Sequence, residues 1–169
     1  MRNVMTAALL GLATIVAAPT AQAQEADFLS SLDGSFTGTG TVKVRTNSKP
    51  VKVTCTFSSN ASGNALSLNG RCRGLVVVSR AISADLRAKG SRYSGTYVGA
   101  GTGPASLSGS RRGNAISLGV RWSKEVNGDR QAQLKVEKVG ADRLRLTTTD
   151  KDPETGQSVV TSRIDLRRS

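Results

Sequence analysis

Two runs of alternating apolar and polar residues, 51–57 and 66–72, constrain the fold of this chain more than any other feature. Such alternation is typical of a β-strand that buries one face. Between the runs lies Gly63-Asn64, a dipeptide suited to a two-residue hairpin turn because glycine readily adopts positive φ. A turn there places Cys55 opposite Cys72 at a non-hydrogen-bonded position, where facing side chains approach closely. The sequence therefore predicts a β-hairpin closed by a Cys55–Cys72 disulfide.

The first 23 residues have the pattern of a secretory signal peptide. Arg2 supplies the positive start, residues 4–18 form an apolar run, and Ala21-Gln22-Ala23 is a small-residue cleavage site. The run has about 15 residues, short of the roughly 20 that a membrane-spanning helix needs. We therefore expect cleavage near Ala23, a periplasmic or secreted protein, and no membrane span. Disulfides form and persist in such oxidising compartments, which supports the bond between the two cysteines.

The rest of the chain has the length of one domain. We divide the sequence into the signal peptide (1–23), a short N-terminal segment or helix (24–34) and a β-domain (35–169). The middle segment has the apolar spacing of a short helix and stops at Gly34. From residue 35 onward no helical period is found, and alternation indicates eight to ten antiparallel strands with short connections. Such a set must close on itself or form two layers to hide its edges.

Short sequential connections favour an all-β, antiparallel up-and-down barrel, with a β-sandwich as the alternative. A second hairpin supports this interpretation, because residues 113–122 repeat residues 63–72 with six of ten positions identical. In that repeat Ala105 is expected to face Trp122. Further along, residues 127–129 are expected to form a three-residue loop with a bulge, since that register turns three apolar side chains inward. These are Ala132, Leu134 and Val136.

The β-rich part of the sequence resembles a set of small, exported, basic β-barrel proteins of proteobacteria. The resemblance is carried by Gly38-Thr39-Gly40-Thr41-Val42, by the Cys55 and Cys72 pair, by Ser94-Gly95-Thr96-Tyr97 and by the hairpin at 109–118. It implies a barrel fold and an exported location, and it implies no reaction. The glycine-rich hairpins are also faintly similar to avidin-type barrels of the calycin kind. Those hold biotin with several tryptophans, whereas this chain has only Trp122, so biotin is not expected.

The composition excludes several chemistries. The chain has no histidine, which removes Ser-His-Asp and Cys-His catalysis and the commonest transition-metal ligand. With both cysteines bonded, the usual donors for zinc or haem are missing. The acidic residues fall mostly on turns or outward positions rather than in an inward pair, as glycoside hydrolysis would need. We therefore expect no catalytic residues, no metal and no cofactor, and we predict that the protein is not an enzyme.

Two groups of residues are candidates for ligand binding. Tyr93, Tyr97 and Trp122 are expected to face inward, where they either line a ligand cavity or simply fill the core. Arg111 and Arg112 adjoin the second hairpin turn, and a third guanidinium, that of Arg121, precedes Trp122. Paired guanidiniums can hold a phosphate or carboxylate in a bidentate manner, although a charged tip that only aids solubility is equally consistent with the sequence.

The charge balance indicates the kind of partner. Removing Arg2 with the signal peptide leaves 23 basic and 12 acidic residues, a net charge of +11. In an exported protein this favours an anionic lipid or glycan of the cell envelope, or a protein partner, over nucleic acid. We therefore predict a periplasmic, envelope-associated binding protein. The alternative is a carrier that holds a small molecule inside the barrel, and the sequence leaves the oligomeric state open.

Overall fold

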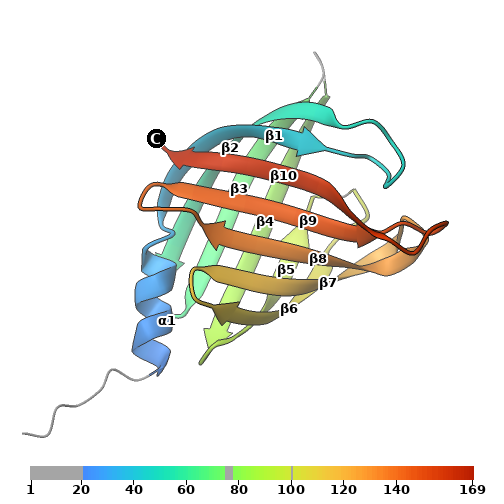
Figure 1. Ribbon diagram of the computed structural model, residues 1–169. Coiled ribbons are helices and arrows are strands. Elements are labelled where there is room, and N and C mark those ends of the chain that lie inside the picture. Colours follow the sequence, from blue (N-terminus) through green and yellow to red (C-terminus); the bar gives the residue numbers. More distant parts are fainter. Residues whose placement is uncertain (1–20, 75–77, 100) are drawn as a thin grey trace, which may run out of the picture.

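The computed structural model describes residues 21–74, 78–99 and 101–169 (Figure 1). Most of the expected signal peptide, residues 1–20, lies outside this part of the chain. The described residues form one helix and ten strands. In chain order these are α1 (Ala21–Ser30), β1 (Gly34–Val42), β2 (Val51–Ser62), β3 (Ala65–Gly74), β4 (Val78–Lys89), β5 (Arg92–Val98), β6 (Ala105–Arg112), β7 (Ala115–Val126), β8 (Asp129–Lys138), β9 (Arg143–Lys151) and β10 (Ser158–Arg168).

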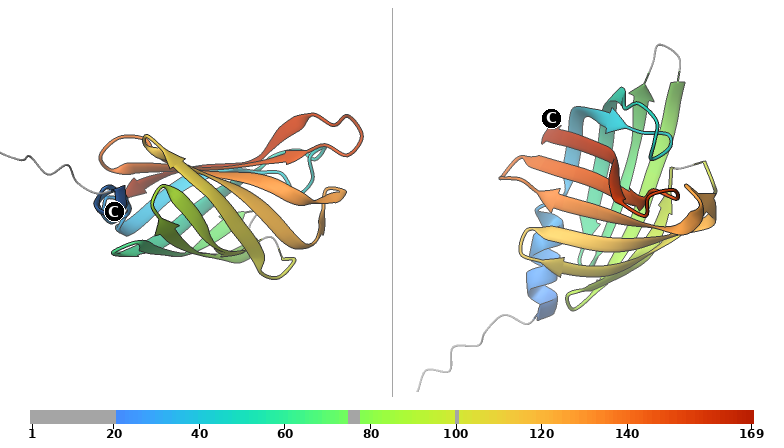
Figure 2. Two further views of the ribbon diagram at one scale, coloured as in Figure 1. Left: turned by 90° about the horizontal axis from the view of Figure 1, so that it is seen from below. Right: turned by 45° about the vertical axis from the view of Figure 1, so that its right-hand side comes forward.

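The strands form a closed barrel in which each pairs antiparallel with its neighbours in sequence. Closure is made by β1 and β10, which pair from Phe36 with Arg168 to Val42 with Ser162. Figure 2 shows the sheet curling round until these first and last strands lie side by side. Closure gives every described strand a hydrogen-bonded neighbour on both sides, which is how an all-β chain limits edge-to-edge association. The predicted up-and-down barrel is confirmed, and the sandwich alternative is wrong.

The hairpin formed by β2 and β3 has the predicted register. Cys55 pairs with Cys72 and Phe57 with Gly70, and the two cysteines form a disulfide on the inward face. The Phe57 ring covers the space where a side chain at position 70 would project, so that any Cβ there would collide with it. The alternation, the Gly63-Asn64 turn and the cysteine spacing therefore all specify this one pairing.

The second hairpin is also confirmed, but the next connection is not. In β6 and β7, Leu107 pairs with Val120. Between β7 and β8, however, Val126 pairs with Asp129, so the turn has two residues and not three. Asn127 and its neighbour, Gly128, both have positive φ, as a primed turn requires. The extra residues are instead absorbed inside the strands, where the register shifts between Arg121 and Val126.

This bulge turns inward the same side chains that the predicted three-residue loop would have turned inward. Ala132 and Val136 are buried, and Leu134 packs against the core. The inward face of β8 is therefore the expected one. The sequence identified the need for an irregularity and misplaced it, because Asn127 tolerates the left-handed conformation that a two-residue turn demands.

Helix α1 lies across one end of the barrel, at the left in Figure 1. It contacts β2, β3 and β4, and Leu29 and Leu32, on the helix and just after it, are fully buried. The helix begins at Ala21, before the expected start of the N-terminal segment. No helix among residues 21–74, 78–99 and 101–169 is long and apolar enough to cross a bilayer.

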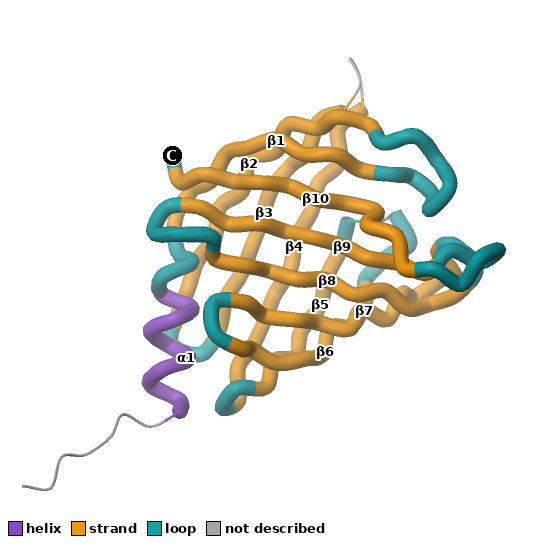
Figure 3. The backbone as a smooth tube through the Cα atoms, in the orientation of Figure 1, coloured by secondary structure: helices purple, strands orange, loops and turns teal. Residues whose placement is uncertain are grey.

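The two ends of the barrel differ in construction. The helix end consists of α1 and the turns at 63–64, 90–91, 113–114 and 139–142. The loop end, opposite to it, includes the segments 43–50, 101–104, 127–128 and 152–157. Figure 3 shows the long connections of the loop end, in teal, on the side away from the helix. The two ends therefore differ: a packed helix lies across one, and connecting segments join the strands at the other.

Candidate functional site

The interior of the barrel contains an apolar cavity of about 50 Å³. Ten of the fifteen residues that line it are leucines, contributed by strands from all round the barrel and by the segment after α1. The lining consists of Leu32, Ser59, Leu66, Leu68, Ile82, Ala84, Leu86, Tyr97, Leu107, Leu118, Leu134, Val136, Leu144, Leu146 and Leu166. The barrel interior therefore contains a small cavity whose wall is almost wholly hydrocarbon.

Ser59 places a polar hydroxyl group in this largely hydrocarbon lining. Its side chain is 2% exposed, and its Oγ atom has no hydrogen-bond partner within the described parts of the protein. A buried hydroxyl without a partner costs about 1–3 kcal/mol, so native proteins seldom retain one without a reason. A polar atom on a bound molecule, or a water beside it, would remove this cost.

At the helix end, two of the predicted residues meet a third that sequence reasoning did not select. The Tyr93 hydroxyl donates to Glu25 Oε2 at 2.6 Å, and Arg111 Nε donates to the same oxygen at 2.8 Å. The Arg111 guanidinium also lies 4.6 Å from the centre of the Phe28 ring. Glu25 is buried, 3% exposed. The cluster joins α1 to the ends of β5 and β6, and its hydrogen bonds close this end of the barrel.

The protonation of these groups follows from the contacts. Burial alone raises the pKa of Glu25, but the hydrogen bonds from Arg111 and Tyr93 outweigh burial and hold that pKa below its usual value. Burial, followed by the hydrogen bond to Glu25, raises the pKa of Tyr93. Glu25 is therefore an anion and Tyr93 a neutral donor near neutral pH. The charge of Arg111 is balanced inside the protein and is not free to hold an external anion.

Tyr97 and Trp122 form a second aromatic pair nearer the loop end. Their rings meet edge to face, with centroids 5.8 Å apart. Ala105, which pairs with Tyr97, leaves room for both rings on the same inward face. Tyr97 lines the cavity, whereas Trp122 is buried with its Nε1 atom unpaired among the described residues. Of the three predicted aromatic residues, only Tyr97 touches the cavity.

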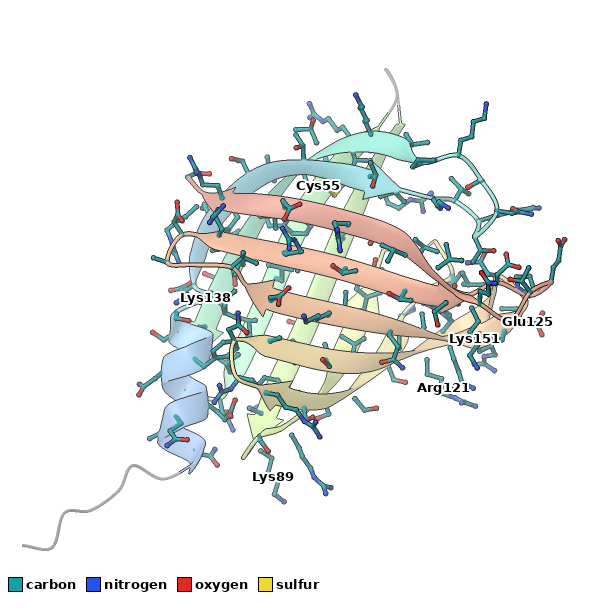
Figure 4. All side chains as sticks on the ribbon, viewed as in Figure 1. Cys55, Lys89, Arg121, Glu125, Lys138 and Lys151 are labelled. Atoms are coloured by element: carbon teal, nitrogen blue, oxygen red, sulfur yellow. A yellow bond between two sulfur atoms is a disulfide. The ribbon has the colours of Figure 1, made fainter. Side chains whose placement is uncertain are left out.

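The other two predicted arginines lie on the outside. Arg112 and Arg121 are exposed, and Figure 4 shows Arg121 projecting away from the barrel. Neither is near the cavity lining. The six candidates thus fall into a helix-end cluster, an inward aromatic pair and two surface cations, and do not form one site. Their role in binding stays a prediction.

Arg80, at the loop end of β4, was missed by sequence reasoning. It lies on the same face of the strand as Ile82, Ala84 and Leu86, all three of which line the cavity. Its partner in the sheet is Cys72, whose side chain also faces inward. Counting alternate residues back from Leu86 would have found this inward cation.

A metal centre is not built by the described residues. No group of three or more cysteine, aspartate or glutamate side chains lies close enough together there to hold an ion. Asp150 is buried at the loop end, and burial raises its pKa, with hydrogen bonds from Asn127 and the Lys151 amide opposing that rise. Asn127 also accepts from the Thr46 amide at 3.3 Å. This network ties three segments of the loop end together.

Comparison with known proteins identifies solved structures that share the fold. No family model matches the chain, and no curated protein matches its sequence. Two solved structures are similar. One is the crystal structure of Rv2717c from M. tuberculosis, with 15% identity and a TM-score of 0.67, covering 86% of this chain and 97% of that one. The other is the S-type phycobiliprotein lyase CPES from Guillardia theta, with 10% identity and a TM-score of 0.58, covering 89% and 98%.

These likenesses show that the fold is shared with two solved structures, in keeping with the barrel that the sequence resemblance implied. They also correct one expectation. We predicted that the protein is not an enzyme, but a similar barrel is that of a lyase, so this fold is compatible with catalysis. The missing histidine removes particular mechanisms, and it does not remove catalysis as such. The prediction that the protein is not an enzyme is therefore withdrawn.

Proposed function

We propose that this protein binds an apolar small molecule inside the barrel. The observation that carries the proposal is the leucine-lined cavity, with the unpartnered Ser59 hydroxyl in its wall. Small-molecule sites are typically concave and apolar, with few polar groups that fix orientation, and small closed barrels can hold one ligand. The calycin-like fold of the neighbours supports the same function.

The cavity wall offers a direct test with a matched control. Ala84 faces inward on β4 and lines the cavity, whereas Ala81 lies on the opposite face of the same strand and is exposed. Replacing Ala84 by leucine fills the cavity, and the same change at Ala81 leaves it unchanged. We expect calorimetric titration with decan-1-ol to show binding to the wild type, at least tenfold weaker binding to Ala84→Leu, and less than twofold change for Ala81→Leu.

Two results would contradict this function. One is no binding of any straight-chain alcohol from hexan-1-ol to decan-1-ol by a folded wild-type protein. The other is equal binding by Ala84→Leu, which would place the alcohol outside the cavity. Native mass spectrometry of protein purified from its own host adds an independent check, since we expect a bound molecule and would count a purely ligand-free mass against the proposal.

We further propose that the protein is exported to the periplasm of a proteobacterium. The signal-peptide pattern at 1–23 and the Cys55–Cys72 disulfide both support this location. The exported chain would then consist of the segment 24–34 and the barrel domain 35–169. The N-terminal sequence of the exported protein is expected to begin at Gln24, and a start at Met1 would contradict export by this route.

A second candidate function is the binding of an anionic envelope component or a partner protein on the outer surface. The net charge of +11 and the exposed Arg112 and Arg121 favour it. If charge attraction drives it, sedimentation with vesicles of anionic lipid should fall steeply between low and high salt. Equal sedimentation with anionic and neutral vesicles would contradict this candidate.

A further inference from the structure

We propose that the molecule in the barrel is a single-chain amphiphile with an anionic head group, held by Arg80 and the Tyr97 hydroxyl at the loop end with its alkyl chain in the leucine-lined cavity. This inference rests on the proposed function and specifies its ligand class. It requires an unneutralised cation at the loop end of the barrel and a narrow, adaptable apolar cavity between that cation and α1.

Arg80 is placed to be that cation. It is two residues from Ile82 on the inward face of β4, so it stands at the loop end of the cavity wall. In the connection that follows the neighbouring strand β5, a Cβ at Gly101 would lie only 2.6 Å from Arg80 Nη1. In the described part of the chain, no carboxylate lies within salt-bridge distance of Arg80. Its guanidinium is therefore available to pair with an anion in a bidentate manner.

The Tyr97 hydroxyl supplies a second donor beside it. A Cβ at Gly99 would lie 2.5 Å from Tyr97 Oη, and a Cβ at Gly101 would meet the Arg80 guanidinium, so the two donor groups lie beside glycines two positions apart in the chain. Burial raises the pKa of Tyr97, and the positive charge of Arg80 opposes that rise. The hydroxyl therefore stays protonated at neutral pH, and it can donate to an anionic oxygen that Arg80 attracts.

Arg111, which lies on the inward face of β6, cannot play this part. Arg111 is at the helix end, where Glu25 accepts from its Nε atom at 2.8 Å and balances its charge. An anion placed there would have to compete with a carboxylate already held by Arg111 and Tyr93. The polar group of an amphiphile is thus expected at the loop end, and its apolar end is expected to point toward α1.

The cavity suits a flexible chain more than a ring. Arg80 and Leu86 are six residues apart on β4, roughly 20 Å of strand. The cavity of about 50 Å³ is smaller than the roughly 150 Å³ apolar cavity that accepts benzene in another protein. Leucine is not branched at Cβ and changes rotamer more readily than valine or isoleucine, so ten leucines can move apart for a thin flexible chain.

The experiment compares three ten-carbon probes that differ only at the head: decanoate, decan-1-ol and decyltrimethylammonium. Calorimetric titration of the intact, oxidised protein should give an affinity order of anion, then alcohol, then cation. We expect Arg80→Gln to weaken decanoate at least tenfold and decan-1-ol less than twofold, since charge-assisted hydrogen bonds account for about that much binding. Tyr97→Phe should weaken decanoate about fivefold.

Arg87→Gln is the matched control, because Arg87 is exposed on the outer face of the same strand and the variant loses the same charge. It should change both affinities less than twofold, which separates a local head-group contact from the effect of net charge. Equal wild-type affinity for decanoate and decan-1-ol, or unchanged decanoate affinity in a folded Arg80→Gln, would overturn the head-group assignment and leave the cavity function standing. Absence of binding by both probes would overturn the two proposals together.

Discussion

The two ends of the barrel place an arginine and a tyrosine in opposite situations. At the helix end, Arg111 and Tyr93 both donate to the buried carboxylate of Glu25, and α1 packs over them. At the loop end, Arg80 and Tyr97 share an inward face, and no described carboxylate neutralises the cation. An arginine and a tyrosine thus help to close the helix end. At the loop end the same two residue types can still donate hydrogen bonds to another molecule.

This difference indicates how stability and binding are divided. The Glu25 carboxylate is buried and Arg111 is partly buried, and such an ion pair is costly to break because removing one partner leaves the other charge without compensation. An exposed unpaired cation contributes little to folding, and its main effect is on what binds beside it. We therefore expect substitutions at the helix end to change stability, and substitutions at the loop end to change affinity.

The largest expected effect is the loss of the helix-end carboxylate. Glu25→Gln should lower the free energy of unfolding by about 2 kcal/mol, because Arg111 would keep its charge without a counter-ion. Urea unfolding at pH 7 measures this. Asp27→Asn, on the exposed side of the same helix, is the control and should change stability by less than about 0.5 kcal/mol. Similar losses for both variants would mean that the Glu25 cluster does not hold the helix in place.

A smaller effect is expected from acid, with opposite signs at the two ends. The folded protein holds the Glu25 pKa below its usual 4.5, so the stability that Glu25 contributes is complete above that pH and is lost as pH falls below it. Burial holds the Asp150 pKa above 3.8, so protonation of Asp150 on acidification favours the folded state. The stability difference between wild type and Glu25→Gln should narrow as pH falls below about 4.5.

Asp150→Asn provides the opposite trend at the loop end. Relative to this variant, the wild type should gain stability as acid protonates its buried carboxyl. Unfolding curves of the three proteins between pH 7 and pH 3.5 check both trends, and parallel curves for all three would rule out the pKa differences between the ends.

The smallest expected effect on stability is that of Arg80. Arg80→Gln should change the free energy of unfolding by no more than about 0.5 kcal/mol, because the exposed guanidinium has no described salt-bridge partner to lose. Arg111→Gln should cost more, since it leaves Glu25 buried with one donor fewer. A loss at Arg80 as large as that at Arg111 would show that Arg80 is a structural residue, contrary to the proposed division.

Much of the fold could be predicted from local patterns. The alternation of residues 51–57 and 66–72, the Gly63-Asn64 turn and the two cysteines specify one register, and the structure has it. The turn after β7 could not be placed as well, because a bulge trades residues between strand and loop without changing which side chains face inward. The two-residue period of a strand indicates on which face of the sheet a residue lies. It does not indicate whether an extra residue is accommodated in a strand or in the adjoining turn.

The candidate site could be predicted only in part, for a related reason. Tyr93, Tyr97 and Trp122 face inward as expected, but strand alternation cannot say which of them reaches the cavity. Glu25 lies 68 residues from Tyr93 and 86 from Arg111 in sequence. No local pattern links such residues, since only the docking of α1 onto the barrel end brings them into contact.

The sequence by itself determined the strand class, the disulfide and the inward faces, because these depend on a two-residue period and on turn chemistry that act over short stretches of chain. The tertiary structure decided which arginine is neutralised and which is free, because charge pairing depends on distances set by barrel closure and helix packing. Residues far apart in the chain meet only when the sheet closes, and at that point the two ends of one barrel become different.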